Sequence, residues 1–563
     1  MSIGHQPDHR LGPPSRVALA AVLLLATQAW SQNTPADALR ANERAIREAQ
    51  QRLQPEADVF TQDKALPQAP AEELSSDSTC VQGVEPVLLG HPEHWREEPL
   101  EVLSRHAGGC HGPRSLNRLL ADLNSWYQAQ GLITTRVYIE SQKLQAGPLK
   151  LRVVPGTVQS IAINGNQQDP RIASAFALRD GDLLNLRDLE QGLENINRLP
   201  SQQGQFRLLP GDSNGTSRIE VDVAPRPAVR VTELIDNSGT PAMGRWKSTT
   251  ELAVDNPTEH NDQLAVGLLH NLDRGDLQAV FQGLTLNYLR PHGKHLWLAS
   301  ASWIDTRFTL PGINTEYGLR THSGKLSLGY EYLFMRDQVS KHSLMAGVDV
   351  TRQRTEVEGF EVPSQTRRLT VAHVGIKGKR FVGNQVYEWW GRMEQGLRSF
   401  NAQHSLPDGT DPQFRLLKLR LNGTWPLPDN NGLVRSVIYA QAAPANTPTL
   451  AQMYVGGRYD VRGYQQNSLY APSGWYARNE YETAAWHAGH WRLNGYAGLD
   501  AGRVQKLASR PLSQQYLSGS VLGLRAELGQ VRADLGWAYA LSRPSEFANE
   551  SRNRLYAQLS ITF

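Results

Sequence analysis

The C-terminal part of the chain alternates apolar and polar residues with a period of two. The pattern is clear in GKLSLGYEYLF (324–334), in LKLRLNGTW (417–425) and in RLYAQLSITF (554–563). Successive side chains of a β-strand point to opposite faces, so each stretch predicts a strand with one apolar and one polar face. Helical periodicity almost disappears from residues 229–563, and we therefore expect this region to be all β.

The length of this β region decides between two all-β folds. A soluble sandwich also alternates, but it rarely exceeds about 250 residues as one domain, whereas about 335 residues alternate here. Segments of roughly ten residues, aromatic residues near the strand ends and the terminal Phe563 fit a transmembrane β-barrel with apolar side chains facing lipid. At about 20 residues per strand and connection, we predict about sixteen antiparallel strands around an aqueous lumen.

Residues 79–228 repeat one short plan twice, and each copy predicts a β-α-α-β-β module. The modules span 79–155 and 156–228. Apolar residues recur at helical spacing in both, and strands such as LKLRVV and RIEVDV follow; the helical positions are Leu116, Leu119, Leu120 and Leu123 in the first module and Leu186, Leu189, Leu193, Ile196 and Leu199 in the second. Small α+β modules leave sheet edges that accept another chain by strand addition. From the residues alone, two structural spacers are an equally good interpretation.

The N-terminus predicts three further segments. Residues 1–31 have early arginines, the apolar run VALAAVLLLA and small residues at Ala29 and Ser31, which is typical of a secretory signal peptide. Residues 32–54 predict a helix that is polar nearly all round, and such a helix lies in water, bridges domains or occupies a hydrated cavity. The lumen of the predicted barrel offers such a cavity. Residues 55–78 are rich in Pro, Gln, Glu and Ser and predict a linker.

Composition and cysteine content narrow the class further. The mean hydropathy is -0.46 and no apolar run reaches the length of a spanning helix, which excludes a helical membrane protein. The formal net charge of +3 gives no indication of a nucleic-acid partner. Cys80 and Cys110 are the two cysteines, and in an exported chain they predict one disulfide rather than two buried free thiols.

No catalytic or metal-binding pattern emerges from the sequence. GLRTHSGK (318–325) has the wrong spacing for a phosphate-binding loop, and we interpret it as a loop before a strand. His91 and His94 are spaced only loosely for a metal and are expected at the surface. RGD at 274–276 is interpreted as a charged hairpin turn. We therefore expect no enzyme activity, no cofactor and no metal.

One glycine-rich stretch concentrates cationic and aromatic residues. GGRYDVRGY (456–464) lies between two late predicted strands and carries Arg462. Further on, RLNGYAGLDAGRV (492–504) predicts a strand whose odd positions are apolar or small, so Asp500 faces the lumen. An inward-folded loop would bring Arg462 to this carboxylate, and Arg–carboxylate pairs can be bidentate. Alternation alone equally allows Arg462 to be a solvated loop residue.

These two motifs resemble the paired signatures of a known family. VRGY (Val461, Arg462, Gly463 and Tyr464) together with GLDAG (Gly498, Asp500 and Gly502) is similar to motifs of the outer-membrane transporters of two-partner secretion, the TpsB or haemolysin-activator family. The family strand motif often begins with Phe, where this chain has Gly498. DNSGT (236–240) is similar to the family's entry into its first strand. The resemblance covers nearly the whole mature chain and implies a plug helix, two POTRA modules and a sixteen-stranded barrel.

The resemblance implies both a function and partners. It implies an outer-membrane channel of a Gram-negative bacterium, with its POTRA modules in the periplasm, that exports one large unfolded β-rich exoprotein without ATP. It also implies that Arg462 pairs with Asp500 inside the barrel, and that the barrel assembly machinery inserts the chain into the lipid bilayer. Two alternatives are an assembly factor for other barrels and a passive porin or adhesin. Cytolysin, adhesin and contact-dependent toxin all remain open as cargo.

Overall fold

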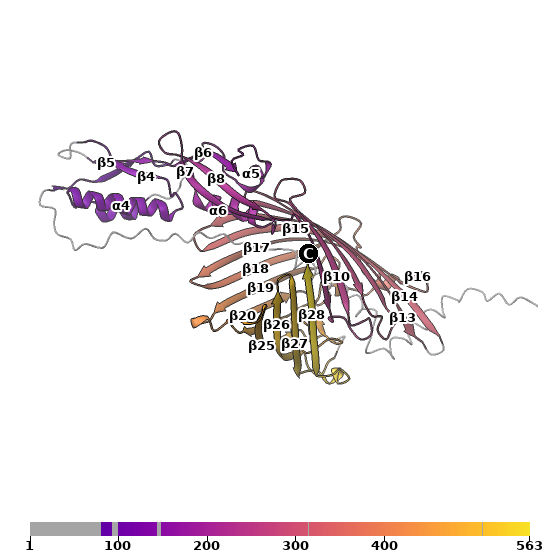
Figure 1. The fold of residues 1–563 in the computed structure, drawn as a ribbon. Coiled ribbons are helices and arrows are strands. Elements are labelled where there is room, and N and C mark those ends of the chain that lie inside the picture. The colour runs from indigo at the N-terminus through magenta and orange to yellow at the C-terminus, as the bar shows by residue number, and fades with distance from the viewer. Residues whose placement is uncertain (1–79, 93–98, 143–147, 313–314, 509–510) are drawn as a thin grey trace, which may run out of the picture.

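The fold is a closed antiparallel β-barrel preceded by two small α+β modules (Figure 1). It is a computed structural model that describes residues 80–92, 99–142, 148–312, 315–508 and 511–563. The predicted signal peptide (1–31), polar helix (32–54) and linker (55–78) lie outside the described residues. Among the residues described, no helix is both long enough and apolar enough to cross a bilayer.

Sixteen long strands close the barrel, as predicted from the alternation. They are β9 (Val229–Asp236), β10 (Lys247–Asp255), β11 (Gln263–Asn271), β12 (Val280–His292), β13 (His295–Pro311), β14 (Glu316–Arg336), β15 (Ser340–Val357), β17 (Arg367–Val382), β18 (Gln385–Leu397), β19 (Arg415–Pro426), β20 (Leu433–Ala442), β23 (Gly474–Glu482), β25 (Trp491–Val504), β26 (Tyr516–Leu528), β27 (Val531–Ser542) and β28 (Asn553–Thr562). Two short strands, β16 (Phe360–Glu361) and β24 (Trp486–Ala488), extend the sheet at hairpins, and short 3-10 turns lie at Pro363–Gln365, Pro428–Asn430, Thr449–Ala451 and Ser545–Phe547. The first and last strands, β9 and β28, pair over Thr232–Asp236 to complete the ring.

The apolar side chains of the strands face outward, as the alternation predicts. Leu326 and Leu328 on β14 are 50% and 51% exposed, and Leu555 on β28 is 64% exposed. Their polar neighbours line the interior, where Lys325, for example, pairs with Asp349 of β15. This inside-out arrangement is stable only when hydrocarbon surrounds the barrel, because water would meet a continuous apolar band.

The strands of one barrel wall are longer than predicted. β14 has 21 residues and β15 has 18, well beyond the roughly ten that we expected for each strand. Residues 318–325 lie inside β14, so the interpretation of GLRTHSGK as a loop before a strand is wrong. The glycines and polar residues that suggested a loop lie toward the end of β14 distant from the modules. RGD at 274–276 lies in the turn between β11 and β12, as expected.

Each N-terminal module packs two helices on a three-stranded sheet. The first contains β1 (Val81–Gln82), β2 (Pro86–Leu89), α3 (Leu100–His106), β3 (Cys110–His111), α4 (Pro113–Ala129), β4 (Arg136–Ile139) and β5 (Leu149–Val154), with sheet order β2-β5-β4 and a separate β1-β3 pair. The second contains β6 (Thr157–Ile163), α5 (Pro170–Ala175), α6 (Leu186–Asn197), β7 (Gln202–Pro210) and β8 (Thr216–Pro225), with order β6-β8-β7. The predicted helical leucines, Leu119, Leu123, Leu189 and Leu193 among them, form the two cores.

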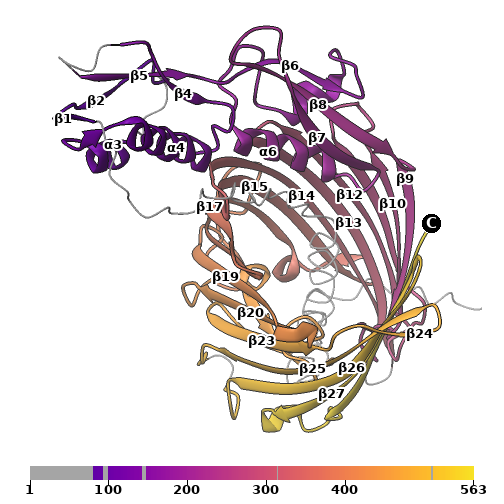
Figure 2. The same ribbon diagram turned by 60° about the vertical axis from the view of Figure 1, so that its left-hand side comes forward.

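The modules lie in a row on one side of the barrel mouth (Figure 2). The second module sits over β12 to β15, and its helix α5 contacts β12. At this end the strands are joined by short turns, such as Gly293–Lys294 between β12 and β13. Longer connections join the strands at the opposite end, and the longest of these, residues 443–473 between β20 and β23, contains the VRGY motif.

Candidate functional site

The connection 443–473 folds back against the inner wall of the barrel. Two short strands, β21 (Met453–Val455) and β22 (Leu469–Ala471), pair antiparallel and hold the base of the loop together. An apolar cluster surrounds them, and Val461 and Tyr464 of the motif are fully buried in it. Arg462 lies at the tip of the loop with only 2% of its surface exposed, so a solvated surface position is excluded.

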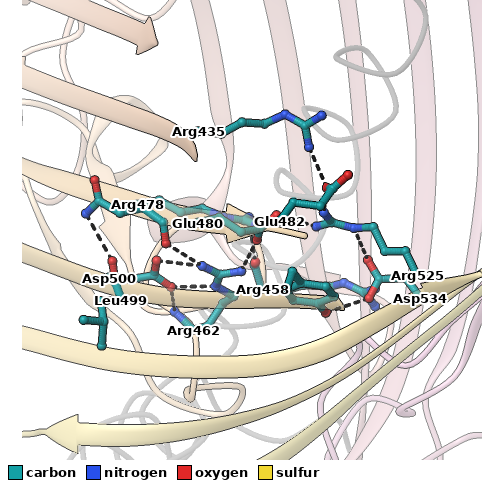
Figure 3. Close-up of polar contacts among 12 residues, drawn as sticks. Arg435, Arg458, Arg462, Arg478, Glu480, Glu482, Leu499, Asp500, Arg525 and Asp534 are labelled. Atoms are coloured by element: carbon teal, nitrogen blue, oxygen red, sulfur yellow. Dashed lines mark hydrogen bonds and ion pairs between the residues drawn. The ribbon is translucent and has the colours of Figure 1, made fainter. Parts of the chain in front are cut away.

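The Arg462 guanidinium forms a bidentate pair with Asp500 of β25 (Figure 3). Its Nε donates to Asp500 Oδ2 at 2.7 Å and its Nη2 donates to Oδ1 at 2.9 Å. The backbone N–H of Arg462 donates to the same Oδ2 at 3.1 Å. Both side chains are buried, so three charge-assisted bonds fix the loop tip in one orientation on the wall.

A second carboxylate on the barrel wall also binds Arg462. Glu480 of β23 accepts from its Nη1 at 2.5 Å and is 7% exposed. Glu480 in turn pairs with Arg525 of β26 at 2.6 Å, and Arg525 lies over the ring of Tyr496, 4.2 Å from its centroid. Figure 3 shows that this network continues to Glu482, Asp534 and Arg435, so the loop tip joins a charged stripe that crosses neighbouring strands.

Glu480 was missed in the sequence analysis although a signal was present. In RNEYE (478–482) the even positions are all charged, and an inward face of alternating Arg and Glu could have been read from the same period of two that placed Asp500.

Glycines make room for Arg462 on the wall. A Cβ at Gly498 would lie 2.2 Å from Arg462 Nη2, and one at Gly519 would lie 1.8 Å from the Arg462 carbonyl oxygen. Gly463 has a φ of +104°, which other residues rarely adopt, and a Cβ there would meet the β27 backbone. Gly498, at the position where the family often has Phe, therefore leaves room for the Arg462 guanidinium. Gly502 similarly lies against Val455 of the loop base.

The rest of the motif is fixed by hydrogen bonds to the last strands. The Tyr464 hydroxyl donates to the carbonyl oxygen of Ser518 at 2.9 Å and also contacts that of Ser542. The Tyr556 hydroxyl of β28 accepts from the Gly463 N–H and donates to the Tyr464 carbonyl oxygen, both at 3.1 Å. The motif thus contacts β25, β26, β27 and β28 within a few residues.

Glu550, which the sequence analysis did not single out, anchors the residues that follow the motif. Its carboxylate accepts from the backbone N–H groups of Gln465, Gln466 and Asn467 at 2.6, 2.8 and 3.1 Å. Glu550 comes from the connection between β27 and β28, is 3% exposed, and pairs with Arg554 at 3.0 Å. It is therefore a second anchor of the loop, independent of Asp500.

The second module is joined to the barrel by a buried polar junction. Arg336, the last residue of β14, donates to Glu194 at 2.8 Å and to Gln191 at 2.9 Å, both on α6. Lys341 of β15 pairs with Glu194 at 2.7 Å. Burial alone would raise the pKa of the Glu194 carboxyl, but the charges of Lys341 and Arg336 hold it below its usual value.

Two further contacts surround this junction. Asn195 donates to the carbonyl oxygens of Ala175 and Gly293, both at 2.8 Å. Asn261, in the turn between β10 and β11, donates to Ser174 Oγ at 2.8 Å. The module therefore contacts three successive turns of the barrel mouth, which fixes its orientation relative to the lumen.

The remaining sequence candidates lie away from this site. Cys80 and Cys110 form a disulfide in the first module, with Cα atoms 5.4 Å apart. His91 Nδ1 lies 2.7 Å from the Tyr127 hydroxyl, and His94 lies outside the described residues. In the part of the chain that the structure describes, no group of three or more His, Cys, Asp or Glu residues could hold a metal ion.

Comparisons with known proteins agree with this architecture. A family model described as haemolysin secretion/activation protein ShlB/FhaC/HecB matches residues 215–526, and two POTRA domain models match residues 81–156 and 157–210. The outer membrane transporter CdiB-2 of Burkholderia pseudomallei is 30% identical over 79% of this chain and 77% of its own length. The hemolysin transporter protein ShlB of Serratia marcescens is 26% identical over 89% of this chain and 88% of its own length.

The solved structure of CdiB from Escherichia coli shares the fold, with a TM-score of 0.85 at 22% identity over 95% of this chain and all of that one. The family model covers more than half of the chain, and the barrel, the modules and the inward loop are all in place. The chain belongs to the ShlB/FhaC/HecB family of haemolysin secretion/activation proteins, the outer-membrane transporters of two-partner secretion, whose POTRA domains lie in the periplasm.

Proposed function

We propose that this transporter exports one large, unfolded, β-rich protein, and that the loop carrying Arg462 is the part that responds to the passing chain. The observation that carries the proposal is the buried bidentate pair of Arg462 and Asp500. It fixes an otherwise irregular segment against the lumen wall, and residues of this segment line the cavity through which we propose that the exported chain passes.

The charged interior supports passage of an unfolded chain. The lumen is lined by residues of both signs, among them Lys325, Asp349, Arg392, Glu394 and Lys418, and many of these pair with one another. The charged side chains of the wall can form hydrogen bonds with the backbone of the exported chain. Over the described residues, the wall has no continuous apolar surface that would bind the exported chain tightly. Neither the sequence nor the described part of the structure offers a nucleotide site, so folding of the partner outside would drive transport.

The modules provide a receiving surface for the partner. In the second module, β7 is an edge strand of nine residues paired only with β8, and Gln205 and Leu209 on it are exposed. Such an edge can accept an extended segment by strand addition. A photo-crosslinking residue at Gln205 should capture the partner, whereas the same residue at Arg218, on the central strand β8, should capture little.

The names of the relatives suggest the range of cargo. Two relatives are named hemolysin transporters and four are named CdiB transporters. We therefore propose that the cargo is a large secreted toxin or cytolysin of these classes.

Three further proposals concern the transporter itself. We propose that residues 32–54 plug the lumen and that the module boundaries follow 79–155 and 156–228. We also propose that the barrel assembly machinery inserts the chain.

A secretion assay on single and double variants tests the role of the pair. Arg462→Ala and Asp500→Ala should each reduce secretion of the partner while the barrel still reaches the outer membrane. Arg462→Ala leaves the Asp500 carboxylate buried without its cation, and Asp500→Ala removes three hydrogen bonds and leaves the guanidinium with Glu480 as its remaining carboxylate. The double variant should be little worse than either single variant, since the two residues act as a unit.

Arg435→Ala is the matched control for this assay. Arg435 lies at the exposed end of the same charged stripe, where it pairs with Glu482 at 2.9 Å, and in the described structure no direct bond joins it to the loop. Because its side chain is 47% exposed, its loss should disturb the stripe little. Secretion should be measured per folded barrel. Strictly additive losses, or full secretion by Arg462→Ala, would contradict a role for the pair in transport.

A further inference from the structure

A row of cationic side chains lies on the outer surface of the barrel, at the end distant from the modules. Arg307 on β13, Arg320 and His322 on β14, Arg352 on β15 and Arg368 on β17 lie on four adjacent strands. We call these five residues the cationic rim. Among the described residues, no hydrogen bond or ion pair joins these five residues to residues 461–464, so the rim is separate from the loop site described above.

The outward direction of the rim follows from strand periodicity. Trp303 on β13, Leu326 on β14, Leu344 on β15 and Val374 on β17 are each at least 47% exposed and face lipid. Each rim residue is an even number of residues away from the lipid-facing residue on its own strand, so it faces the same way. Cross-strand register makes two cation pairs, Arg307 with Arg320 and Arg352 with Arg368. Between β14 and β15 the two pairs are offset along the strands, with Arg320 opposite Glu356 and Arg352 opposite Gly324.

The depth of the rim corresponds to the boundary of the membrane. On β14, Tyr332 lies near the module end and His322 follows about ten residues further on, which is the length of one tilted crossing of the hydrocarbon. Two exposed aromatic residues flank this level. Trp303 lies two residues from Asp305, and the carbonyl oxygen of Phe400 accepts from Arg352 Nη2 at 2.9 Å. Aromatic residues commonly mark this interface.

The positive charge of the rim is only partly neutralised. Asp305, which is 3% exposed, lies behind Arg307, Arg320 and His322 and accepts from the two arginines at 2.9 Å. Arg354, next to the rim on β15, is paired with Glu356 and Glu361. Arg352 and Arg368 have no ion-pair partner among the described residues. Asp305 thus holds Arg307 and Arg320, and Glu356 lies opposite Arg320 in register, so these two arginines are largely compensated. The pair Arg352 and Arg368 is the part of the rim that is available to an anion from outside.

Among the described strand residues, the opposite side of the barrel has one cation at this level, Arg503, and no such row. On β20, β23, β25, β26 and β27, the corresponding outward residues at the same end are Ala442, Trp475, Arg503, Tyr516 and Leu541. A general preference for charge at the barrel end would have placed cations on both sides. The clustering therefore indicates an anionic ligand on one side, at the depth of lipid headgroups.

We propose that the cationic rim binds the phosphorylated headgroup of an outer-leaflet glycolipid, a lipopolysaccharide. Guanidinium groups match phosphate oxygens in bidentate geometry, and the apolar band beneath them, including Trp303 and Leu326, accommodates the acyl chains of the same molecule. The ligand needs both a phosphate and acyl chains, because the arginines that would bind the phosphate lie directly above a lipid-facing surface. The rim would fix the orientation of this wall in the outer leaflet.

Lipid retention by the purified full chain tests the proposal. The wild-type barrel, extracted in mild detergent and examined by native mass spectrometry, should retain lipopolysaccharide. The triple variant R320Q/R352Q/R368Q should retain at least about tenfold less, because each arginine near a charged lipid surface adds to the attraction. The variant R492Q/R503Q/R532Q, which removes three exposed arginines elsewhere on the barrel, should retain as much as wild type.

Measurements on the wild-type protein keep the test independent of variant folding. Enzymatically dephosphorylated lipopolysaccharide and phosphatidylglycerol should each bind several-fold more weakly than intact lipopolysaccharide, and inorganic phosphate should not displace it. Equal retention by the triple variant, equal binding of the dephosphorylated glycolipid, or displacement by free phosphate would each overturn the proposal. Heat-modifiable migration in gels confirms that each variant barrel is folded.

Discussion

At the scale of single residues, the site depends on buried charges whose hydrogen-bonding capacity is used. Arg462 contacts two carboxylates and a backbone carbonyl oxygen, and Asp500 also accepts from the Arg462 backbone. A buried ion pair contributes little net stability over an apolar pair, but loss of one partner is strongly destabilising, by about 3–5 kcal/mol. Such an arrangement therefore selects one loop position rather than increasing overall stability.

Glu550 provides a prediction at this scale. Glu550→Ala should release the residues after the motif, because three backbone N–H groups lose their acceptor, and secretion should fall without loss of the folded barrel. Protease sensitivity of the loop and secretion per barrel are the two measurements. Glu546→Ala, in the same connection but exposed and bonded to Ser513, is the control and should behave like wild type.

At the scale of elements, the junction between α6 and the barrel fixes the second module relative to the lumen. Arg336 and Lys341 reach from β14 and β15 to Glu194, and Asn195 and Asn261 add uncharged bonds on either side. All these groups are directional, so the module is fixed in rotation as well as in position. We infer that the second module moves with the barrel as one body. In the described residues, the hydrogen bond seen between the first module and the barrel is a long one, from Gln338 Nε2 to the carbonyl oxygen of Ala129 at 3.5 Å.

The junction should depend on pH through Glu194. Its folded-state pKa lies below the ordinary value of 4.5, so the junction is stabilised above pH 4.5 and loses that stabilisation as the pH falls through the lower folded value. Hydrogen exchange in α6 should therefore accelerate in that range. Glu194→Gln should remove this pH dependence.

Arg336→Ala should weaken the junction at neutral pH by about 1–3 kcal/mol, because Glu190 and Glu194 each lose one charged partner while Arg187 and Lys341 still pair with them. Hydrogen exchange in α6 at pH 7 is the measurement. Lys294→Ala, which removes a more exposed pair with Asp188, should change little. Equal exchange in the Arg336 and Lys294 variants would contradict the assignment.

The disulfide gives a second prediction at the element scale. Cys80 and Cys110 should resist thiol reagents until the protein is reduced. Replacing both with Ser should destabilise the first module by about 3–4 kcal/mol in the chain-entropy picture, since the closed loop spans about 30 residues. The heat resistance of the barrel should not change. Limited proteolysis separates the two effects, and free labelling of the unreduced protein would contradict the bridge.

The elements differ in how far the sequence could predict them. The barrel strands and the two modules were predictable because burial against lipid or a core imposes a period of two or of 3.6. The pairing of Arg462 with Asp500 came from motif resemblance, as 38 residues separate them. Glu550 had no signal, because its connection is irregular and has no period. The polar end of β14 was misread because apolar alternation stops where the strand is no longer beside lipid.

At the scale of the whole molecule, the lumen is the expected path, and its free width determines the conductance. The loop with Arg462 occupies part of the wall. We expect the polar helix predicted for residues 32–54 to occupy more of the lumen. Deleting this segment should raise the ion conductance in planar bilayers, because a helix about 10 Å across would leave the channel. Deletion of linker residues 55–78 alone is the control, and unchanged conductance after deletion of 32–54 would contradict a plug.

The two anchors of the loop have a mechanical consequence. Asp500 holds the tip and Glu550 holds the segment that follows, and the two carboxylates come from different parts of the barrel. A force applied to the loop acts on both anchors, so the loop moves only when the contacts of Asp500 and of Glu550 break at nearly the same time. If transport displaces the loop, as proposed above, the loop would respond with a threshold rather than gradually: a weak force from the exported chain would leave it in place, while a partner that folds strongly outside would displace it.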